Sequence, residues 1–141
     1  MGYSHYWIQL NNPTDEQWDN ITDTFKKSIV VALVTGKSFP IQRENSITAP
    51  PEISSKAIIF NGIYADGHET FYLGRNIEGG DSCKTNHKPY DFAVMVCLIL
   101  AEHFAPDCWK VTSDGVRGQW QLAADWLNAS GLGQFSLPKG I

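Results

Sequence analysis

Cysteines are few in this sequence, and no apolar run is long. The three cysteines, Cys83, Cys97 and Cys108, are an odd number at irregular spacing, so no disulfide framework is indicated and a cytoplasmic location is expected. The longest apolar run, residues 92–101, is about half the ~20 residues that a membrane-spanning helix needs. The N-terminal MGYSHYWIQL has no basic stretch followed by an apolar one, so we expect neither a secretory signal nor a membrane partner.

Positive charge is also scarce. Eleven Lys and Arg residues face 15 Asp and Glu residues, which gives a net charge of −4 at pH 7. Proteins that bind duplex nucleic acid normally present a basic face, so no duplex partner is expected, although a local cluster can still hold a small anion. With 141 residues, 43% of them apolar, the chain fits one folded α+β domain over residues 1–141.

The N-terminal part of the chain predicts a strand followed by a helix. Alternating apolar residues indicate a strand over residues 3–10, with His5 and Trp7 on one face. Thr14 has a glutamine three residues later, the pattern of a capping box at a helix N-terminus. Gly36 is the expected end of that helix.

The middle of the chain predicts a loop and a hairpin. Residues 37–56 contain three prolines and read as a long loop. Residues 57–64 and 69–75 are rich in β-forming types, and the Asp66-Gly67 pair between them indicates a tight hairpin turn. Residues 77–88 read as a loop.

The last third of the chain predicts helix, strand and helix. Pro89 is expected to begin a helix that is apolar on every side and therefore buried. A short strand over residues 108–112 follows, and Ser113 or Asp114 is the expected cap of the final helix. Residues 132–141 read as an irregular tail.

The resulting order is β-α-β-β-α-β-α, which is typical of a ferredoxin-like α+β fold. We expect a two-layer sandwich with an antiparallel or mixed sheet and the helices mainly on one face. The other sheet face would be open to solvent, a ligand or a second chain. An open face with few surface charges favours a homo-oligomer.

The segment CKTNHKPYD, just before the apolar helix, is the strongest candidate for a binding site. Lys84, Thr85 and Lys88 can hold a phosphate or carboxylate beside the positive end of a helix. The alternative is structural: Asp91 caps the helix and pairs with Lys88. No GxxxxGK[ST] phosphate-binding motif occurs.

Other polar groups give weaker candidates for catalysis. His68 and Glu69 can act as acid and base, or they lie in a solvated turn. Cys83 and His87 have a C-x3-H spacing, but no CxxC pair supports a metal site, and Cys83 as a nucleophile beside His87 is equally weakly indicated. We therefore expect no metal and no cofactor.

Several aromatic and polar residues are candidate contacts for a nucleotide base or ribose. His5, Trp7 and Tyr90 can stack on a base if they lie on an open face, or they can pack against a second subunit. Asn61 and Asp114 can read polar edges of a ligand. For Asp114 the structural alternative is the helix cap named above.

The phrases SHYW, IIFNG, GHETF, CKTNHKPYD and SDG followed by Trp120 together resemble a family of small hypothetical proteins of bacteria and their viruses. That family has a pattern like HYW…FNG…ETF…FCKTxxKPYD…SDG…W, which covers most of this chain. The sequence departs from it at Ser82, where the pattern has phenylalanine. The resemblance implies a viral or prophage accessory protein and no particular activity.

Three functions follow as hypotheses. The first is a protein that sequesters a small anionic ligand, a nucleotide or cyclic nucleotide immune signal, and so counters host defence in the host cytoplasm. The second is a small nucleotide hydrolase or phosphodiesterase that uses His68 and Glu69. The third is an inhibitor that binds a host defence complex directly. The lysine cluster beside aromatic strands favours the first by analogy.

Overall fold

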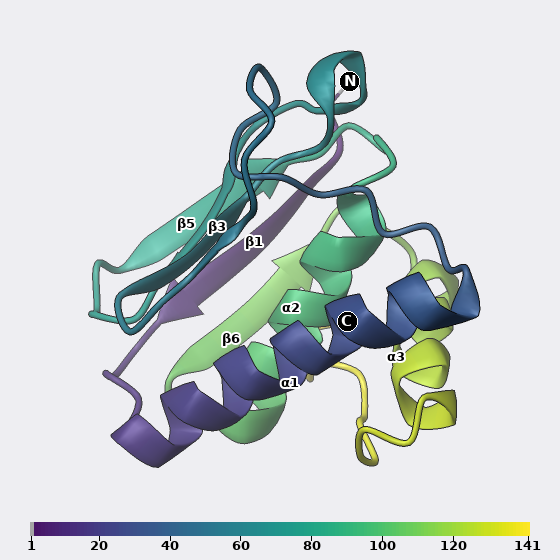
Figure 1. Cartoon of the computed structure of the whole chain (residues 1–141). Coiled ribbons are helices and arrows are strands. Elements are labelled where there is room, and N and C mark those ends of the chain that lie inside the picture. Colours follow the sequence, from purple (N-terminus) through teal and green to yellow (C-terminus); the bar gives the residue numbers. More distant parts are fainter. Residues whose placement is uncertain (1) are drawn as a thin grey trace.

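Three helices and six strands make up the part of the chain that the computed structural model describes, residues 2–141 (Figure 1). In chain order they are β1 Ser4–Gln9, α1 Asp15–Thr35, β2 Glu52–Ile53, β3 Ala57–Phe60, β4 Phe71–Gly74, β5 Gly80–Lys84, α2 Asp91–Phe104, β6 Trp109–Ser113 and α3 Arg117–Ala129. One turn of 3-10 helix, Tyr64–Asp66, lies between β3 and β4. The predicted α+β class is confirmed.

The strands form two antiparallel three-stranded sheets, in the orders β5-β1-β6 and β2-β3-β4. The two sheets approach each other where the Glu69 N–H donates to the Lys84 carbonyl at 3.2 Å. The ferredoxin-like sandwich is not confirmed. The predicted loop over residues 77–88 was wrong, because it contains β5, which pairs with residues 4–8 of β1. Its sequence, GDSCK, carries no apolar alternation by which a strand is recognised.

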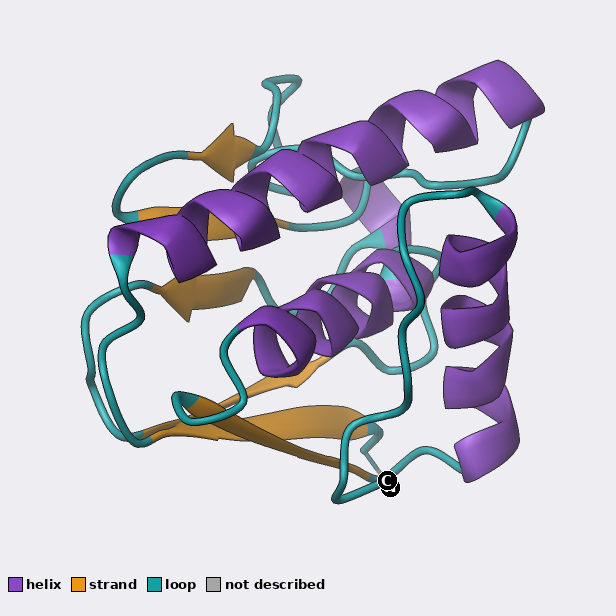
Figure 2. Cartoon of the chain, turned by 90° about the horizontal axis from the view of Figure 1, so that it is seen from below, coloured by secondary structure: helices purple, strands orange, loops and turns teal. Residues whose placement is uncertain are grey.

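Helix α2 lies at the centre of the molecule. Figure 2 shows it between the strands, with α1 and α3 on its other sides. Ten consecutive residues, 93–102, are buried, so the prediction of a central helix is confirmed. No helix within residues 2–141 is long and apolar enough to cross a membrane.

Helix α1 covers α2 through one apolar stripe. The Thr14 side chain accepts from the Gln17 N–H at 3.1 Å, and the Gln17 side chain accepts from the Thr14 N–H at 2.9 Å. The predicted capping box is therefore confirmed. Buried Trp18 and Phe25 face the core. Gly36 ends the helix in the left-handed conformation, with φ 74°.

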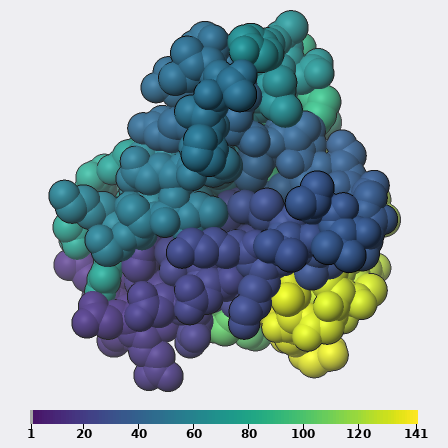
Figure 3. Space-filling view, in the orientation of Figure 1, coloured from purple at the N-terminus to yellow at the C-terminus, as the bar shows by residue number. Residues whose placement is uncertain are grey.

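The connection between α1 and β3 folds back over the molecule, as the blue surface in Figure 3 shows. Residues 37–56 are largely irregular but include β2. The tight turn predicted at Asp66-Gly67 is wrong, because a 3-10 turn and the Asn61 side chain form a wider connection there. The Asn61 amide donates to the His68 carbonyl at 3.0 Å, and its oxygen accepts from the His68 N–H at 3.1 Å.

Candidate functional site

His5 joins three segments that are distant in the sequence. It lies on the inner face of β1 and is completely buried. Its Nε2 atom is 2.6 Å from Asp91 Oδ1 on α2, and its Nδ1 atom is 2.7 Å from Ser113 Oγ at the end of β6. The Trp120 ring of α3 packs against the imidazole in a T-shaped contact, with ring centroids 5.0 Å apart and planes 80° apart. Both ring nitrogens are therefore satisfied away from water.

Asp91 is held on a second side by Thr85. The Thr85 hydroxyl is buried and donates to Asp91 Oδ1 at 2.5 Å. Two donors thus converge on one carboxylate oxygen in the first turn of α2, where a negative charge is also favoured by the helix dipole. Within residues 2–141 no ion pair joins Lys88 to Asp91; the partner of the carboxylate is His5.

Ser113 and Asp114 bind β1 and do not cap α3. The prediction of a cap at these positions is wrong, because α3 begins at Arg117 and its N-cap residue is Val116. The Asp114 carboxylate accepts from the Ser4 N–H and from the Tyr6 hydroxyl, both at 3.0 Å. Both bonds reach Oδ2, which leaves Asp114 Oδ1 as an acceptor for other partners.

A surface depression of about 670 Å³ lies beside this cluster and is lined by Gly2, Tyr3, His87 and Asp114. The Tyr3 and His87 rings stack with centroids 3.5 Å apart and planes 29° apart. His87 reaches this position because Asn86 and His87 both have positive φ, 53° and 60°. Asparagine and histidine tolerate that conformation better than most residues. The exposed His87 ring therefore gives the depression an aromatic wall, and the buried Tyr3 ring lies against it.

A lysine borders the depression. A Cβ atom built on Gly2 would lie 2.7 Å from Lys84 Cε and 3.1 Å from Lys84 Nζ. The Lys84 ammonium therefore lies against the Gly2 backbone at the rim. The opposite charge is present as well, on the Asp114 carboxylate. The depression thus offers an aromatic wall, one cation and one acceptor, which suits a ligand that is partly anionic and carries hydroxyl groups.

The Tyr3 hydroxyl stays protonated at neutral pH. Burial raises its pKa to about 12, and the nearby Asp91 and Asp114 carboxylates add to the shift. The hydroxyl donates to Gln119 Oε1 at 3.1 Å. Tyr3 is therefore a hydrogen-bond donor between the His5 cluster and α3.

Three predicted ligand contacts lie elsewhere. Trp7 is only 4% exposed and packs against Phe71 in the core. Tyr90 is completely buried, and its hydroxyl donates to the Glu69 carbonyl at 2.5 Å. Asn61 holds the β3–β4 connection. The structure thus brings together His5, Thr85, Asp91 and Asp114, with Lys84 at the rim, and places Trp7, Tyr90 and Asn61 in structural positions.

The weaker catalytic candidates do not converge. The Glu69 carboxylate accepts from the Lys84 N–H at 2.8 Å and so joins β5 to the second sheet, while His68 is exposed. Burial raises the pKa of the Cys83 thiol to about 12, which leaves almost no thiolate at neutral pH. In the described part of the chain, no group of three or more His, Cys, Asp or Glu side chains is placed to hold a metal ion.

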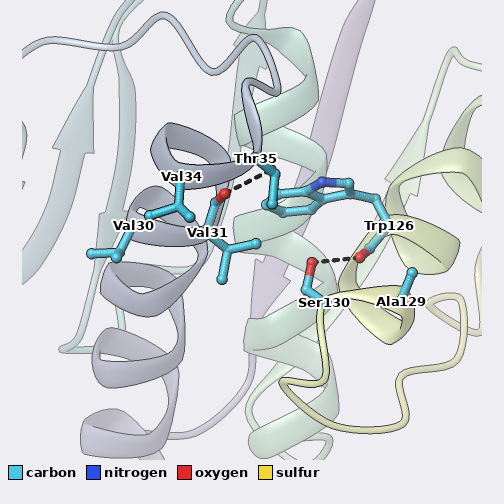
Figure 4. A pocket seen from close by; sticks show the side chains of 7 residues that line it. All are labelled: Val30, Val31, Val34, Thr35, Trp126, Ala129 and Ser130. Carbon is cyan, nitrogen blue, oxygen red and sulfur yellow. Dashed lines mark hydrogen bonds between the residues drawn. The ribbon is translucent and has the colours of Figure 1, made fainter.

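A second hollow, of about 520 Å³, lies between the C-terminal turns of α1 and α3 (Figure 4). Its walls are mainly Val30, Val31, Val34 and Trp126. The hydroxyls of Thr35 and Ser130 donate to carbonyls of their own helices at 2.7 Å and are not free for a ligand. This apolar groove lacks the oriented polar groups that make a specific site for a polar molecule.

The sequence did not identify Tyr3 as part of the site. The available signal was its position two residues before His5, which places both side chains on the same face of β1. For Ser113 the sequence indicates only a helix cap. Its contact with His5 joins residues 108 positions apart, and no local pattern reports such a contact.

Comparisons with known proteins add no function to this site. The chain matches no protein-family model, no curated protein and no solved structure. The resemblance to small viral and bacterial proteins therefore stays a prediction.

Proposed function

We propose that the depression beside Tyr3 and His87 binds a small anionic ligand with an aromatic group, a nucleotide or cyclic nucleotide. The observation that carries this proposal is the stacked Tyr3–His87 pair, which lines the same hollow as Asp114. Stacking on an aromatic side chain is worth roughly 1–3 kcal/mol per base. A base can therefore stack on this wall without hydrogen bonds that distinguish one base from another.

The charged groups suit the rest of a nucleotide. Asp114 can accept from ribose hydroxyls through Oδ1, since both of its protein hydrogen bonds reach Oδ2. Lys84 at the rim supplies a positive charge for phosphate. Lys88, four residues further along the same connection, is the second candidate cation for the phosphate group.

A thermal-shift screen against mono-, di- and cyclic nucleotides tests the proposal. A ligand at 100 times its Kd adds about 2.7 kcal/mol to the free energy of unfolding. We expect His87→Ala to lose this shift, because the exposed ring on which the base stacks is gone. The matched variant His68→Ala, at an exposed histidine of the β3–β4 connection, should keep it. Equal shifts in both variants would place the ligand elsewhere.

The role in countering a host defence, and the homo-oligomer, stay predictions. The first rests on the resemblance and the second on the open sheet face. On that face Tyr6 and Ile8 are 39% and 53% exposed. Recovery of the bound nucleotide intact after prolonged incubation would favour sequestration.

A further inference from the structure

The geometry points to a serine nucleophile beside the depression: Ser113, His5 and Asp91 form a relay that hydrolyses small carboxylic esters. This activity goes beyond ligand binding and does not depend on which nucleotide the depression takes. It rests on a chain of hydrogen bonds from Ser113 Oγ through both nitrogens of His5 to the Asp91 carboxylate, with lengths of 2.7 and 2.6 Å.

The order of groups along this chain suits a nucleophilic serine when Asp91 is ionised and His5 is neutral. An ionised Asp91 only accepts, so His5 Nε2 carries the ring hydrogen and donates to it. In the neutral imidazole Nδ1 is then an acceptor, and the Ser113 hydroxyl donates to it. A nucleophile, a base and an orienting carboxylate in this order are the parts of a serine hydrolase. The ring is turned relative to the chymotrypsin arrangement, with Nδ1 on the serine, but the proton follows the same order of residues.

One further group favours negative charge on the reacting oxygen of Ser113. The Gly115 N–H donates to Ser113 Oγ at 2.8 Å, which stabilises negative charge on that atom as its proton leaves. A Cβ atom built on Gly115 would lie 2.4 Å from the Tyr3 hydroxyl and 3.1 Å from Ser113 Oγ. Both hydroxyls therefore lie close to Gly115, and the Tyr3 hydroxyl, which donates to Gln119 Oε1 at 3.1 Å, belongs to the polar surroundings of Ser113.

The steps balance with water as the co-reactant. Ser113 Oγ bonds to the ester carbonyl carbon while its proton passes to His5 Nδ1. The bond from that carbon to the alcohol oxygen breaks, and the alcohol takes the proton from His5. Water then attacks the acyl-serine, gives a proton to His5, and the proton returns to Ser113 Oγ as the carboxylic acid leaves. Ser113 and His5 are the catalytic residues, and Asp91 is a positioning residue.

A fluorophosphonate probe tests the nucleophile directly on the intact protein. Attack by Ser113 forms an oxygen–phosphorus bond and expels fluoride, and intact mass spectrometry reads one adduct per chain. We expect peptide mapping to place it on Ser113. Ser113→Ala should not label, whereas Ser82→Ala, which removes an exposed serine on neighbouring β5, should label like the wild type. With p-nitrophenyl acetate, Ser113→Ala should lower kcat/KM by about 100-fold or more.

Asp91→Asn separates positioning from folding. It should lower kcat while KM stays within about two-fold, measured on protein shown to be folded by its thermal transition. Absence of an adduct on folded wild-type protein, or an adduct that persists in Ser113→Ala, would overturn the proposal. Because wild-type labelling and mapping need no variant, a variant that fails to fold leaves the test intact. Nucleotide binding without labelling would remove the esterase and keep the binding site.

Discussion

Replacing His5 by alanine should destabilise the protein far more than replacing any exposed histidine. The imidazole is completely buried and bonded on both sides, to Asp91 and to Ser113. A hydrogen bond to a charged group contributes roughly 1.5–3 kcal/mol and one to a neutral group roughly 0.5–1.5 kcal/mol. We therefore expect His5→Ala to lower the free energy of unfolding by about 3 kcal/mol, and the lost packing against Trp120 adds to this loss.

Urea unfolding followed by tryptophan fluorescence measures this difference. Domains of this size have unfolding free energies of about 5–15 kcal/mol, so the variant should stay folded with a lower midpoint and an unchanged slope. The matched control is His68→Ala, for which we expect a change within about 0.5 kcal/mol. If the two variants unfold at the same urea concentration, His5 does not hold β1, α2 and β6 together and the description of the site is wrong.

Two further predictions concern backbone conformation and pH. Gly36→Ala should lower the free energy of unfolding by about 1 kcal/mol: a Cβ there meets nothing within 4 Å, but φ is 74°. Gly118→Ala in α3 also meets nothing within 4 Å and should raise it by about 0.5–1 kcal/mol. A urea midpoint for Gly36→Ala equal to or above that of Gly118→Ala would contradict this. Burial raises the pKa of Cys83 from 9.0 to about 12, so the unfolded chain loses this proton first and stability falls as pH rises above about 9, by about 1 kcal/mol at pH 10 for this thiol. Urea midpoints at pH 8 and pH 10 measure this loss of stability, and the loss should be smaller in Cys83→Ala.

Local patterns in the sequence predicted the helices well. The capping box of Thr14, the glycine stop at Gly36 and the buried apolar helix α2 each depend on residues within a few positions of one another, and each is confirmed. The edge strand β5 was missed because GDSCK has no apolar alternation. Its β-structure comes from pairing with β1, which lies more than 70 residues away in the chain.

The site was predictable only as a set of candidates. The segment before α2 attracted attention through Lys84, Thr85 and Lys88, and the structure places Thr85 as a partner of Asp91. His5 and Ser113 meet there because β1 lies beside β6 in the order β5-β1-β6. Local periodicity in the sequence does not predict strand order. Strand order also decides the position of Trp7. Its aromatic side chain suggests stacking on a base, but the sheet places it in the core.

The most direct test of the central claim is a calorimetric titration of the nucleotide that gives the largest thermal shift. It compares the wild type with Lys84→Ala and with Lys56→Ala, a control at an exposed lysine in the β2–β3 turn. We predict one saturable site per chain, weakened about tenfold or more by the loss of the rim charge in Lys84→Ala and unchanged in Lys56→Ala. Equal affinities for all three proteins, or no heat of binding to the wild type, would contradict a nucleotide site at Tyr3 and His87.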